Sequence, residues 1–245
     1  MTQQNMPRKN CPDFSMPPWP AIDTIMFDMD GTLLDLHFDN FFWLKLVPKN
    51  YANNFNISEK EAASIILQKY KKVRGTLQWY CLDYWQSELN LDILHLKKQI
   101  KEKIAIRPNI ENLLSELQLT NKRILLITNA HPASLEIKMN HTGISRFFHQ
   151  CISSHQLQLA KENPGFWEQL QTIEPYDPQR TLLFDDSFSV LRQAQSEGIR
   201  YLYGIKKPDS KQPNLKHNEF PLVEDFEHIM PSCGEVSNVG SNDHG

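Results

Sequence analysis

The sequence contains few cysteines, and none has a spacing typical of metal ligands. Four cysteines occur in 245 residues, Cys11, Cys81, Cys151 and Cys233, without a CxxC pair. Zinc sites and disulfide frameworks usually show close, regular cysteine spacing. We therefore expect neither a zinc site nor a disulfide framework, and we expect a reducing, cytoplasmic setting.

Long apolar runs and an excess of positive charge are also missing. The longest strictly apolar runs, such as residues 124–127, hold only a few residues, whereas a bilayer-spanning helix needs about 20. Lysine and arginine total 26 against 29 aspartates and glutamates, a net charge of −3. The basic surface that binds a nucleic-acid backbone is therefore absent. We expect neither a membrane nor a nucleic-acid polymer among the partners.

Apolar residues make up 40 % of the chain, enough for a buried core, but the two ends differ from the middle. Residues 1–20 contain five of the 15 prolines and no hydrophobic periodicity, which predicts a disordered lead-in. Residues 208–245 are interpreted as a C-terminal extension that ends in a polar tail. Such a tail buries too little apolar area to offset chain entropy, so disorder is expected beyond residue 231.

Short apolar runs alternate with helical patterns through the middle of the chain. Alternation of this kind predicts βαβ units, and therefore an α/β fold with a Rossmann-like parallel sheet. The core is assigned to residues 21–35 and 104–207. The expected strands are residues 24–27, 123–128, 150–153, 181–184 and 200–203.

The first two strands are separated by far more residues than a crossover needs, and the intervening residues 36–103 have helical patterns only. Ser58 and Glu61 form a capping box, and Gly75 supplies the stop of that helix. Further helices are expected from about Phe41, over residues 77–85 and over residues 93–104. We predict a four-helix-bundle cap inserted after the first strand, where it could cover a site at the sheet edge.

The residues most suggestive of chemistry follow the first strand, in IDTIMFDMDGTLLD (residues 22–35). Asp28 and Asp30 stand two apart, a spacing that directs both carboxylates to the same side of an extended chain. Gly31 and Thr32 then break the strand. A lone DxDG could also be an ordinary aspartate-rich turn without a function. Matches elsewhere in the sequence are needed to distinguish a turn from a functional site.

DMDGTLLD (residues 28–35) resembles the first motif of the haloacid dehalogenase (HAD) superfamily. Three later matches agree in order and spacing over about residues 22–205: Thr128 in ILLITN, Lys161 before the fourth strand, and Asp185 with Asp186 in LLFDDS. The resemblance implies a HAD-like fold. Residues 35–48, 76–85 and 128–132 further resemble the bacterial GMP/IMP nucleotidase members of that superfamily.

The resemblance implies a role for each matched residue. Asp28 is the nucleophile that forms an aspartyl phosphate, and Asp30 is the acid/base that protonates the leaving group and then activates water. Dehalogenases of the superfamily lack this second acid, so a dehalogenase is disfavoured. The implied cofactor is Mg²⁺, held by the Asp28 side chain, the Asp30 backbone carbonyl and Asp186, with Asp185 binding directly or through a water.

Thr128, backbone donors near Asn129, and Lys161 are expected to bind the phosphoryl group. Lys161 lacks an immediately preceding proline, which the family pattern usually has, and Lys138 is a poorer positional match. Nine histidines show no HxxxH or HExxH spacing, so packing or surface roles are expected, with His131 in TNAHP worth testing. Aromatic residues of the insert are expected mainly to pack within the cap.

The expected activity is Mg²⁺-dependent hydrolysis of a small phosphate monoester, with a 5'-nucleotidase acting on purine monophosphates such as GMP and IMP as the implied member. One alternative is a HAD phosphatase or phosphomutase for sugar phosphates or phosphoglycolate, because specificity depends on how the cap closes. The other is a non-catalytic protein that binds Mg²⁺ or a phosphorylated group. Whether the protein is a monomer or a homodimer is left open.

Overall fold

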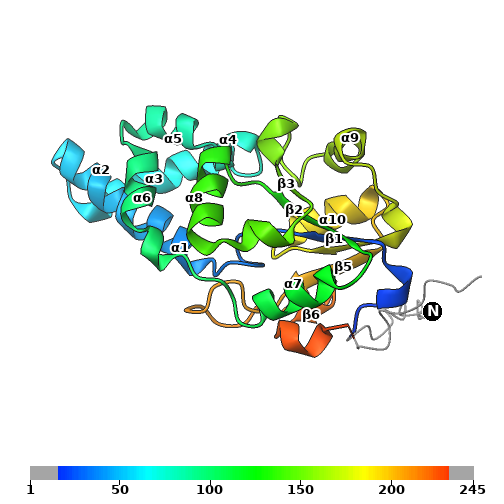
Figure 1. Cartoon of the computed structure of the whole chain (residues 1–245). Coiled ribbons are helices and arrows are strands. Elements are labelled where there is room, and N and C mark those ends of the chain that lie inside the picture. The colour runs from blue at the N-terminus through cyan, green and yellow to red at the C-terminus, as the bar shows by residue number, and fades with distance from the viewer. Residues whose placement is uncertain (1–15, 232–245) are drawn as a thin grey trace, which may run out of the picture.

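The protein, described over residues 16–231 by a computed structural model, is built on a six-stranded parallel sheet of order β3-β2-β1-β4-β5-β6 (Figure 1). This confirms the predicted α/β, Rossmann-like core. The strands are β1 (Thr24–Phe27), β2 (Arg123–Thr128), β3 (Gln150–Ser153), β4 (Thr181–Phe184), β5 (Tyr201–Ile205) and β6 (Leu222–Val223). The first four coincide with the predicted ranges.

Ten α-helices accompany the sheet within the described residues. They are α1 (His37–Phe41), α2 (Val47–Phe55), α3 (Glu59–Val73), α4 (Leu77–Tyr80), α5 (Leu82–Leu89), α6 (Ile93–Gln99), α7 (Ile110–Gln118), α8 (Pro132–Thr142), α9 (Phe166–Ile173) and α10 (Phe188–Ser196). Over residues 16–231, none of these helices is both long and apolar enough to span a bilayer.

Helices cover both faces of the sheet, which is why its strands read as apolar runs instead of alternating patterns. In β1, Ile25 and Phe27 point to the face covered by α7, whereas Met26 points to the face covered by α9 and α10. All three side chains are fully buried. The alternation of side chains along a strand thus supplies two separate cores from one short segment.

The strand order places the carboxyl ends of β1 and β4 at the reversal point of the sheet. From β1 the chain order runs through β2 to β3 on one side, and from β4 through β5 to β6 on the other. Open α/β sheets bind ligands in the crevice at such a point. A ligand site is therefore expected at the residues that follow β1 and β4.

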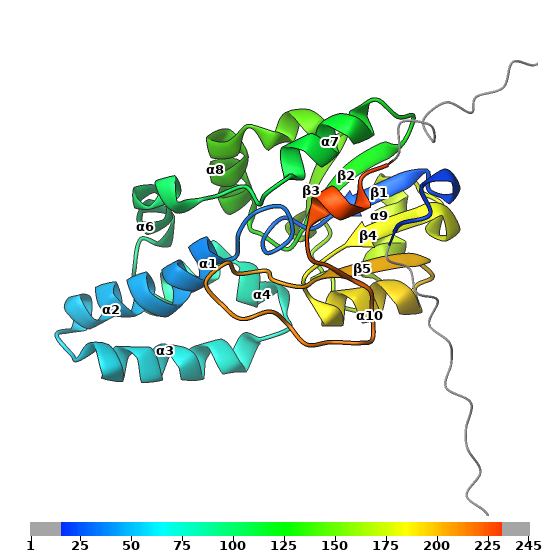
Figure 2. The same ribbon diagram turned by 90° about the horizontal axis from the view of Figure 1, so that it is seen from below.

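Residues 37–103 contain helical elements only, and we call this segment the cap. Its apolar side chains form a cluster of their own, built around Phe42, Ile66 and Trp85. Ser58 caps α3 by accepting from Glu61 N–H at 3.2 Å, as predicted. Figure 2 shows α2 and α3 extending to one side of the sheet. The division into core and cap remains our interpretation of these features.

Three details inside the cap differ from the sequence prediction. The first helix begins at His37 and passes through a π-helical segment, Phe42–Leu46, before α2; Pro48, which cannot donate a backbone hydrogen bond, follows that segment. The helix predicted over residues 77–85 is interrupted at Cys81, whose backbone is extended. The helix predicted to reach Ile104 ends at Gln99. Ile104 instead packs in the same hydrophobic cluster as the buried side chains of α7.

The predicted core boundaries at residues 21 and 207 are too narrow. Trp19 is buried and its Nε1–H donates to Ile229 O at 3.1 Å. Residues 222–223 form β6, which pairs with β5, and Phe226 joins the core cluster. Figure 2 shows the β5–β6 connection passing beside α1. The predicted disorder of residues 1–15 and 232–245 lies outside the described residues.

Candidate active site

Three carboxylates meet at the carboxyl ends of β1 and β4. Phe27 pairs with Phe184 in the parallel register. Asp28 and Asp185 therefore emerge side by side, and Asp28 N–H donates to Phe184 O at 2.9 Å. With Asp186, one oxygen of each of the three carboxylates lies within 4.8 Å of the others. Parallel pairing thus assembles residues that are more than 150 positions apart in the sequence.

Gly31 forms the turn that follows these strand-end residues. Its φ is +92°, a region that glycine adopts without the steric cost that a side chain brings. A Cβ at this position would lie 2.5 Å from Asp186 Oδ2. The glycine of the DxDG motif therefore allows the turn and also makes room for the Asp186 carboxylate.

Lys161 is the single cation in direct contact with this carboxylate cluster among the described residues. Its Nζ donates to Asp28 Oδ1 at 2.6 Å, to Asp185 Oδ2 at 2.7 Å and to Ile127 O at 3.0 Å. Its side chain is almost fully buried, with 2 % exposed, so it is not the solvated surface charge that a lysine in a loop usually is. The structure thus places it where the sequence match predicted, despite the missing proline.

One lysine does not balance three buried carboxylates. Burial and the charge of Asp185 raise the pKa of Asp28 to about 6, against the opposing effect of Lys161. Burial, together with Asp28 and Asp185, raises the pKa of Asp186 well above its usual range. With all groups ionised, three carboxylates and one ammonium leave a net charge of −2. This cluster therefore favours an additional cation.

The donor set of the cluster fits a magnesium ion. All available atoms are oxygens, the ligands that Mg²⁺ prefers. Both oxygens of Asp185 are engaged: Oδ2 accepts from Lys161, and Oδ1 accepts from Ser187 N–H at 2.9 Å. The hydrogen bonds of this cluster within residues 16–231 go to Asp28 and Asp185 and none goes to the Asp186 carboxylate. Of the acidic pair, Asp186 is thus the better candidate for direct coordination.

Thr128 and Asn129 lie at the end of β2, beside the carboxylates. Thr128 Oγ1 accepts from Ala130 N–H at 3.0 Å, which orients the hydroxyl and leaves its own hydrogen available for donation. The Asn129 side chain accepts from Lys161 N–H at 2.9 Å and donates to Glu162 Oε2 at 2.8 Å. Its amide therefore holds the Lys161 loop, a positioning role that the sequence prediction did not include.

Asp30, the expected acid/base, makes an ion pair that the sequence analysis missed. Lys138 Nζ, from α8, lies 2.6 Å from Asp30 Oδ1 and 2.6 Å from Asp39 Oδ2. Asp39, from α1, also pairs with Lys97 of α6 at 2.8 Å. In the sequence, Lys138 is only a poorer match than Lys161 to the motif lysine. The structure shows that it contacts the second aspartate of the motif instead.

The charges around Asp30 act on it in opposite directions. Burial and the neighbouring Asp39 raise the pKa of Asp30 to about 6, while Lys138 opposes the rise. Burial also acts to raise the pKa of Asp39, but Lys138 and Lys97 outweigh it and lower that pKa to about 2. A carboxyl group with a pKa near neutrality can both give and accept a proton. The signals that could have pointed to these partners are a lysine on the inward face of α8 and an acid within the aromatic stretch FDNFFW.

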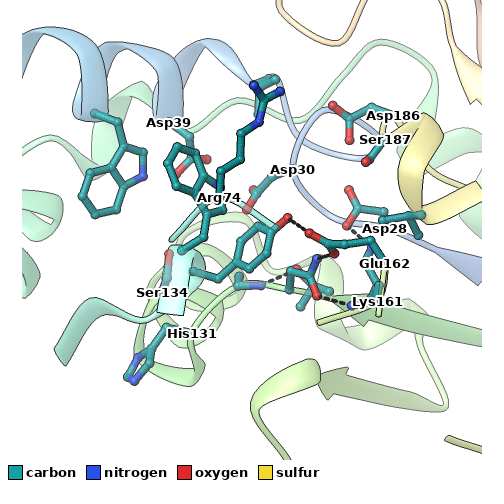
Figure 3. A pocket seen from close by; sticks show the side chains of 18 of the residues that line it. Asp28, Asp30, Asp39, Arg74, His131, Ser134, Lys161, Glu162, Asp186 and Ser187 are labelled. Carbon is teal, nitrogen blue, oxygen red and sulfur yellow. Dashed lines mark hydrogen bonds and ion pairs between the residues drawn. The ribbon is translucent and has the colours of Figure 1, made fainter. Parts of the chain in front are cut away.

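A single cavity of about 710 Å³ opens onto these groups, between the sheet edge and the cap. Figure 3 shows Asp28, Asp30, Lys161 and Asp186 converging on it. All seven residues singled out from the sequence line it: Asp28, Asp30, Thr128, Asn129, Lys161, Asp185 and Asp186.

The cap side of the cavity is aromatic and carries one arginine. Trp43 and Trp79 line it while also packing against Tyr70, so the predicted packing role and a lining role coincide. Tyr80 OH donates to Glu162 Oε1 at 2.8 Å, a contact between cap and core. Arg74 is exposed and reaches over the cavity (Figure 3).

The sequence matches the model of a family described as haloacid dehalogenase-like hydrolases over residues 22–196. The chain belongs to this family. It is 37 % identical over 214 residues to the GMP/IMP nucleotidase YrfG of Escherichia coli (strain K12), a match that covers 87 % of this chain and 96 % of that protein. This HAD-like hydrolase is therefore an enzyme whose relatives include a nucleotidase.

Solved structures of HAD proteins share the fold. A HAD phosphatase from Thermococcus onnurineus superposes with a TM-score of 0.68 at 20 % identity, covering 82 % of this chain and 93 % of that one. The HAD hydrolase YfnB of Bacillus subtilis, bound to magnesium, superposes with a TM-score of 0.53 at 17 % identity, covering 79 % and 90 %. At these identities the likeness concerns the fold alone.

Proposed function

We propose that this HAD-like hydrolase removes phosphate from small monoesters by way of an aspartyl phosphate on Asp28. The observation that carries the proposal is the arrangement of Asp28, Lys161 and Asp30 on one cavity. One carboxylate is held by a buried lysine at 2.6 Å, while the other belongs to a separate ion pair. Two carboxyl groups with different environments suit two different tasks.

The residues of the chain suggest the following sequence of steps. An oxygen of Asp28 attacks phosphorus, and the bond from phosphorus to the leaving oxygen breaks. Asp30 gives its proton to that leaving alkoxide. Water then attacks the aspartyl phosphate, Asp30 takes a proton from it, and the carboxylate of Asp28 is restored with release of phosphate.

Lys161 and Thr128 would stabilise charge on the phosphoryl oxygens during both steps. Lys161 is fixed by three contacts before substrate binds, so it needs no reorganisation, which is the condition for strong electrostatic stabilisation. Asp28, Asp186 and the Asp30 backbone carbonyl are suited to hold Mg²⁺, which when bound would offset the negative charge of the cluster and of the phosphate. Asp185 would then act through Lys161.

For the substrate, we propose purine nucleoside 5'-monophosphates with a 6-oxo group, such as GMP and IMP. Support comes from the 37 % identity to the Escherichia coli GMP/IMP nucleotidase and from the cavity. A volume of about 710 Å³ lies within the range of small-molecule pockets. Trp43 and Trp79 offer flat apolar surface for a base, and Arg74 offers donors for a ring carbonyl. The cytoplasmic setting stays a prediction.

The test is phosphate release by the purified full chain from a panel of GMP, IMP, AMP, sugar phosphates and phosphoglycolate, with and without Mg²⁺. We expect turnover that needs Mg²⁺ and favours GMP and IMP. Asp28→Asn should lower kcat by about a thousandfold or more while the circular dichroism spectrum is kept. The matched control is Asp177→Asn, which alters an aspartate far from the cavity lining.

The outcomes separate the parts of the proposal. Equal turnover of nucleotides and sugar phosphates would reject the nucleotidase and leave a general phosphatase. Conversion of a sugar phosphate to an isomer without release of phosphate would indicate a phosphomutase. Phosphate release that survives in Asp28→Asn would reject the nucleophile, and no release from any substrate with Mg²⁺ present would favour a non-catalytic binding protein.

A further inference from the structure

A second cluster of ligand-type side chains lies beside the cavity, apart from the carboxylates. One ligand atom each of Cys81, His131 and His155 lies within 4.8 Å of the other two. Figure 3 shows the His131 ring turned away from the carboxylate cluster. The catalytic steps proposed above use none of these three side chains. Their proximity therefore calls for a separate explanation.

The three residues come from three separate elements. Cys81 lies at the break between α4 and α5 in the cap, where it is the N-cap of α5. His131 is the N-cap of α8, directly after β2, and His155 lies in the short 3-10 helix that follows β3. The cap thus contributes the sulfur and the core contributes both imidazoles. A spacing rule applied to the sequence does not detect such a set, which is why no zinc site was expected.

The two imidazoles have the mutual placement of ligands on one ion. Their ring centres are 5.0 Å apart and the ring planes are inclined by 78°. Two imidazoles on one tetrahedral zinc ion, with Zn–N bonds of about 2.0 Å, have ring centres about 5 Å apart. The observed separation therefore needs little change. For the sulfur, bond lengths of about 2.3 Å and 2.0 Å place S and N about 3.6 Å apart, which lies inside the 4.8 Å limit that the three ligand atoms satisfy.

His155 provides an independent observation that points to a ligand at this cluster. Its Nε2 is inaccessible to solvent and has no hydrogen-bond partner among residues 16–231. A buried polar atom without a partner is costly and unusual in a folded protein. A metal ion bound at this nitrogen would supply the missing interaction.

The environments of the other two residues are compatible with metal binding. Cys81 Sγ accepts a contact from Tyr84 N–H at 3.5 Å, at the amino end of α5. This contact is long and weak, so the sulfur is not committed to a strong hydrogen bond that would compete with a metal ion. His131 Nδ1 accepts from Ala133 N–H at 3.3 Å, and Nε2 lies 3.4 Å from Asp83 Oδ2. Coordination through Nδ1 of His131 would give up the long contact to Ala133, and coordination through Nε2 would give up the long contact to Asp83; either loss is small beside a metal–nitrogen bond.

We propose that Cys81, His131 and His155 form a binding site for a thiophilic divalent metal ion, for which Zn²⁺ is the probe, joining the cap to the core. Thiolate and imidazole ligands select zinc and its neighbours in the transition series, whereas Mg²⁺ selects oxygen ligands. The two clusters therefore bind different ions. An open fourth position would be taken by water or by the exposed Asp83. An ion bound here fixes Cys81, and with it the adjacent Tyr80 at the cavity wall.

The test measures metal binding by the full chain and does not depend on the proposed activity. Cys11 and Cys233 are replaced by serine throughout, and excess Mg²⁺ occupies the carboxylate cluster. We expect one Zn²⁺ per chain by equilibrium dialysis, bound at least about a hundredfold more weakly by Cys81→Ser and by His155→Gln. Zinc should raise the Tm of the parent protein and not that of Cys81→Ser. Cys151→Ser and His141→Gln are the matched controls and should bind like the parent.

Cobalt distinguishes this cluster from the carboxylates, because only a sulfur ligand gives a thiolate-to-cobalt charge-transfer band. We expect that band when Co²⁺ is added to the parent protein and to Cys151→Ser, and its loss in Cys81→Ser. Equal zinc binding by the parent and Cys81→Ser, or cobalt binding without the thiolate band, would overturn the proposal. Circular dichroism of each variant shows whether a lost site reflects lost folding.

Discussion

Two buried lysines each bridge two aspartates in this protein, and they differ in where their partners come from. Lys161 contacts Asp28 and Asp185, and all three residues follow strands or loops of the core. Lys138 contacts Asp30 in the core and Asp39 in the cap. The ion pairs of the proposed nucleophile are thus made by residues of the core alone. Those of the proposed acid/base are complete only when the cap is in place.

The groups of charged residues around Lys161 and around Lys138 also differ in net charge. With every group ionised, Lys161 faces Asp28, Asp185 and Asp186, a sum of −2. Lys138 and Lys97 face Asp30 and Asp39, a sum of zero. A buried cluster of net charge −2 favours a metal ion, whereas a balanced one does not. Both groups contain aspartates that line the same cavity. The difference in net charge explains why Mg²⁺ is expected beside Asp28 and not beside Asp39.

The largest effect is expected from Lys161→Met. This change leaves Asp28 and Asp185 buried without a cation, so phosphate release should fall about a thousandfold, and the free energy of unfolding should fall by about 3–5 kcal/mol in the absence of metal. Urea unfolding and steady-state kinetics measure the two effects. Unchanged turnover in a folded Lys161→Met protein would show that the reaction at Asp28 does not need the charge of Lys161.

A smaller and more selective effect is expected from Lys138→Met, because it acts through the acid/base. Turnover of nucleotides, whose leaving alkoxide needs a proton, should fall by about a hundredfold. Turnover of p-nitrophenyl phosphate, whose leaving group is stable without a proton, should fall much less. Steady-state kinetics on both substrates give the ratio.

Lys97→Met is the matched control for this ratio. It removes a lysine from the same chain of ion pairs without removing a contact to Asp30, and the ratio between the two substrates should stay near that of the parent protein. An equal loss on both substrates in Lys138→Met would mean that Lys138 supports the fold, or the nucleophile, instead of the acid/base.

The same contrast explains how far the sequence could predict the site. β1 and β4 were predicted within their observed bounds because a buried parallel strand needs a short apolar run, and the residues after them face the crevice by topology. Asp28, Asp30 and Asp186 follow from that rule together with the family motif. These features depend on short apolar runs and on motif residues that are neighbours in the chain, and both can be recognised in the sequence.

The remaining features depend on contacts between distant segments. Lys138 and Asp39 are 99 residues apart. Asp39 lies in one of the stretches that carry the family resemblance, but Lys138 lies in none, so only the packing of the cap against α8 reveals their pairing. Trp19 lies among prolines that predicted disorder, yet it packs against Ile229 near the other end of the chain. Burial of this kind is decided by tertiary structure, where composition is a weak guide.

The smallest effect is expected on the stability of the protein in acid. It reports on Asp39, the cap residue that pairs with Lys138 and Lys97. The pKa of Asp39 is lowered to about 2 in the folded protein, below its ordinary value, so the unfolded chain binds a proton first as the pH falls. Stability due to Asp39 is therefore present at neutral pH and is lost as the pH drops from about 5 towards 2. The shift corresponds to about 2 kcal/mol in total, of which about 1 kcal/mol is lost by pH 3.

Urea unfolding of the parent protein and of Asp39→Asn, at a series of pH values from 7 to 3, measures this contribution. Other carboxyl groups titrate in both proteins, so only the difference between the two free energies of unfolding reports on Asp39. That difference should be constant from pH 7 to about 5 and then shrink by about 1 kcal/mol. A difference that stays constant down to pH 3 would mean that Lys138 and Lys97 do not hold Asp39 ionised, and the link from cap to acid/base would lose its electrostatic basis.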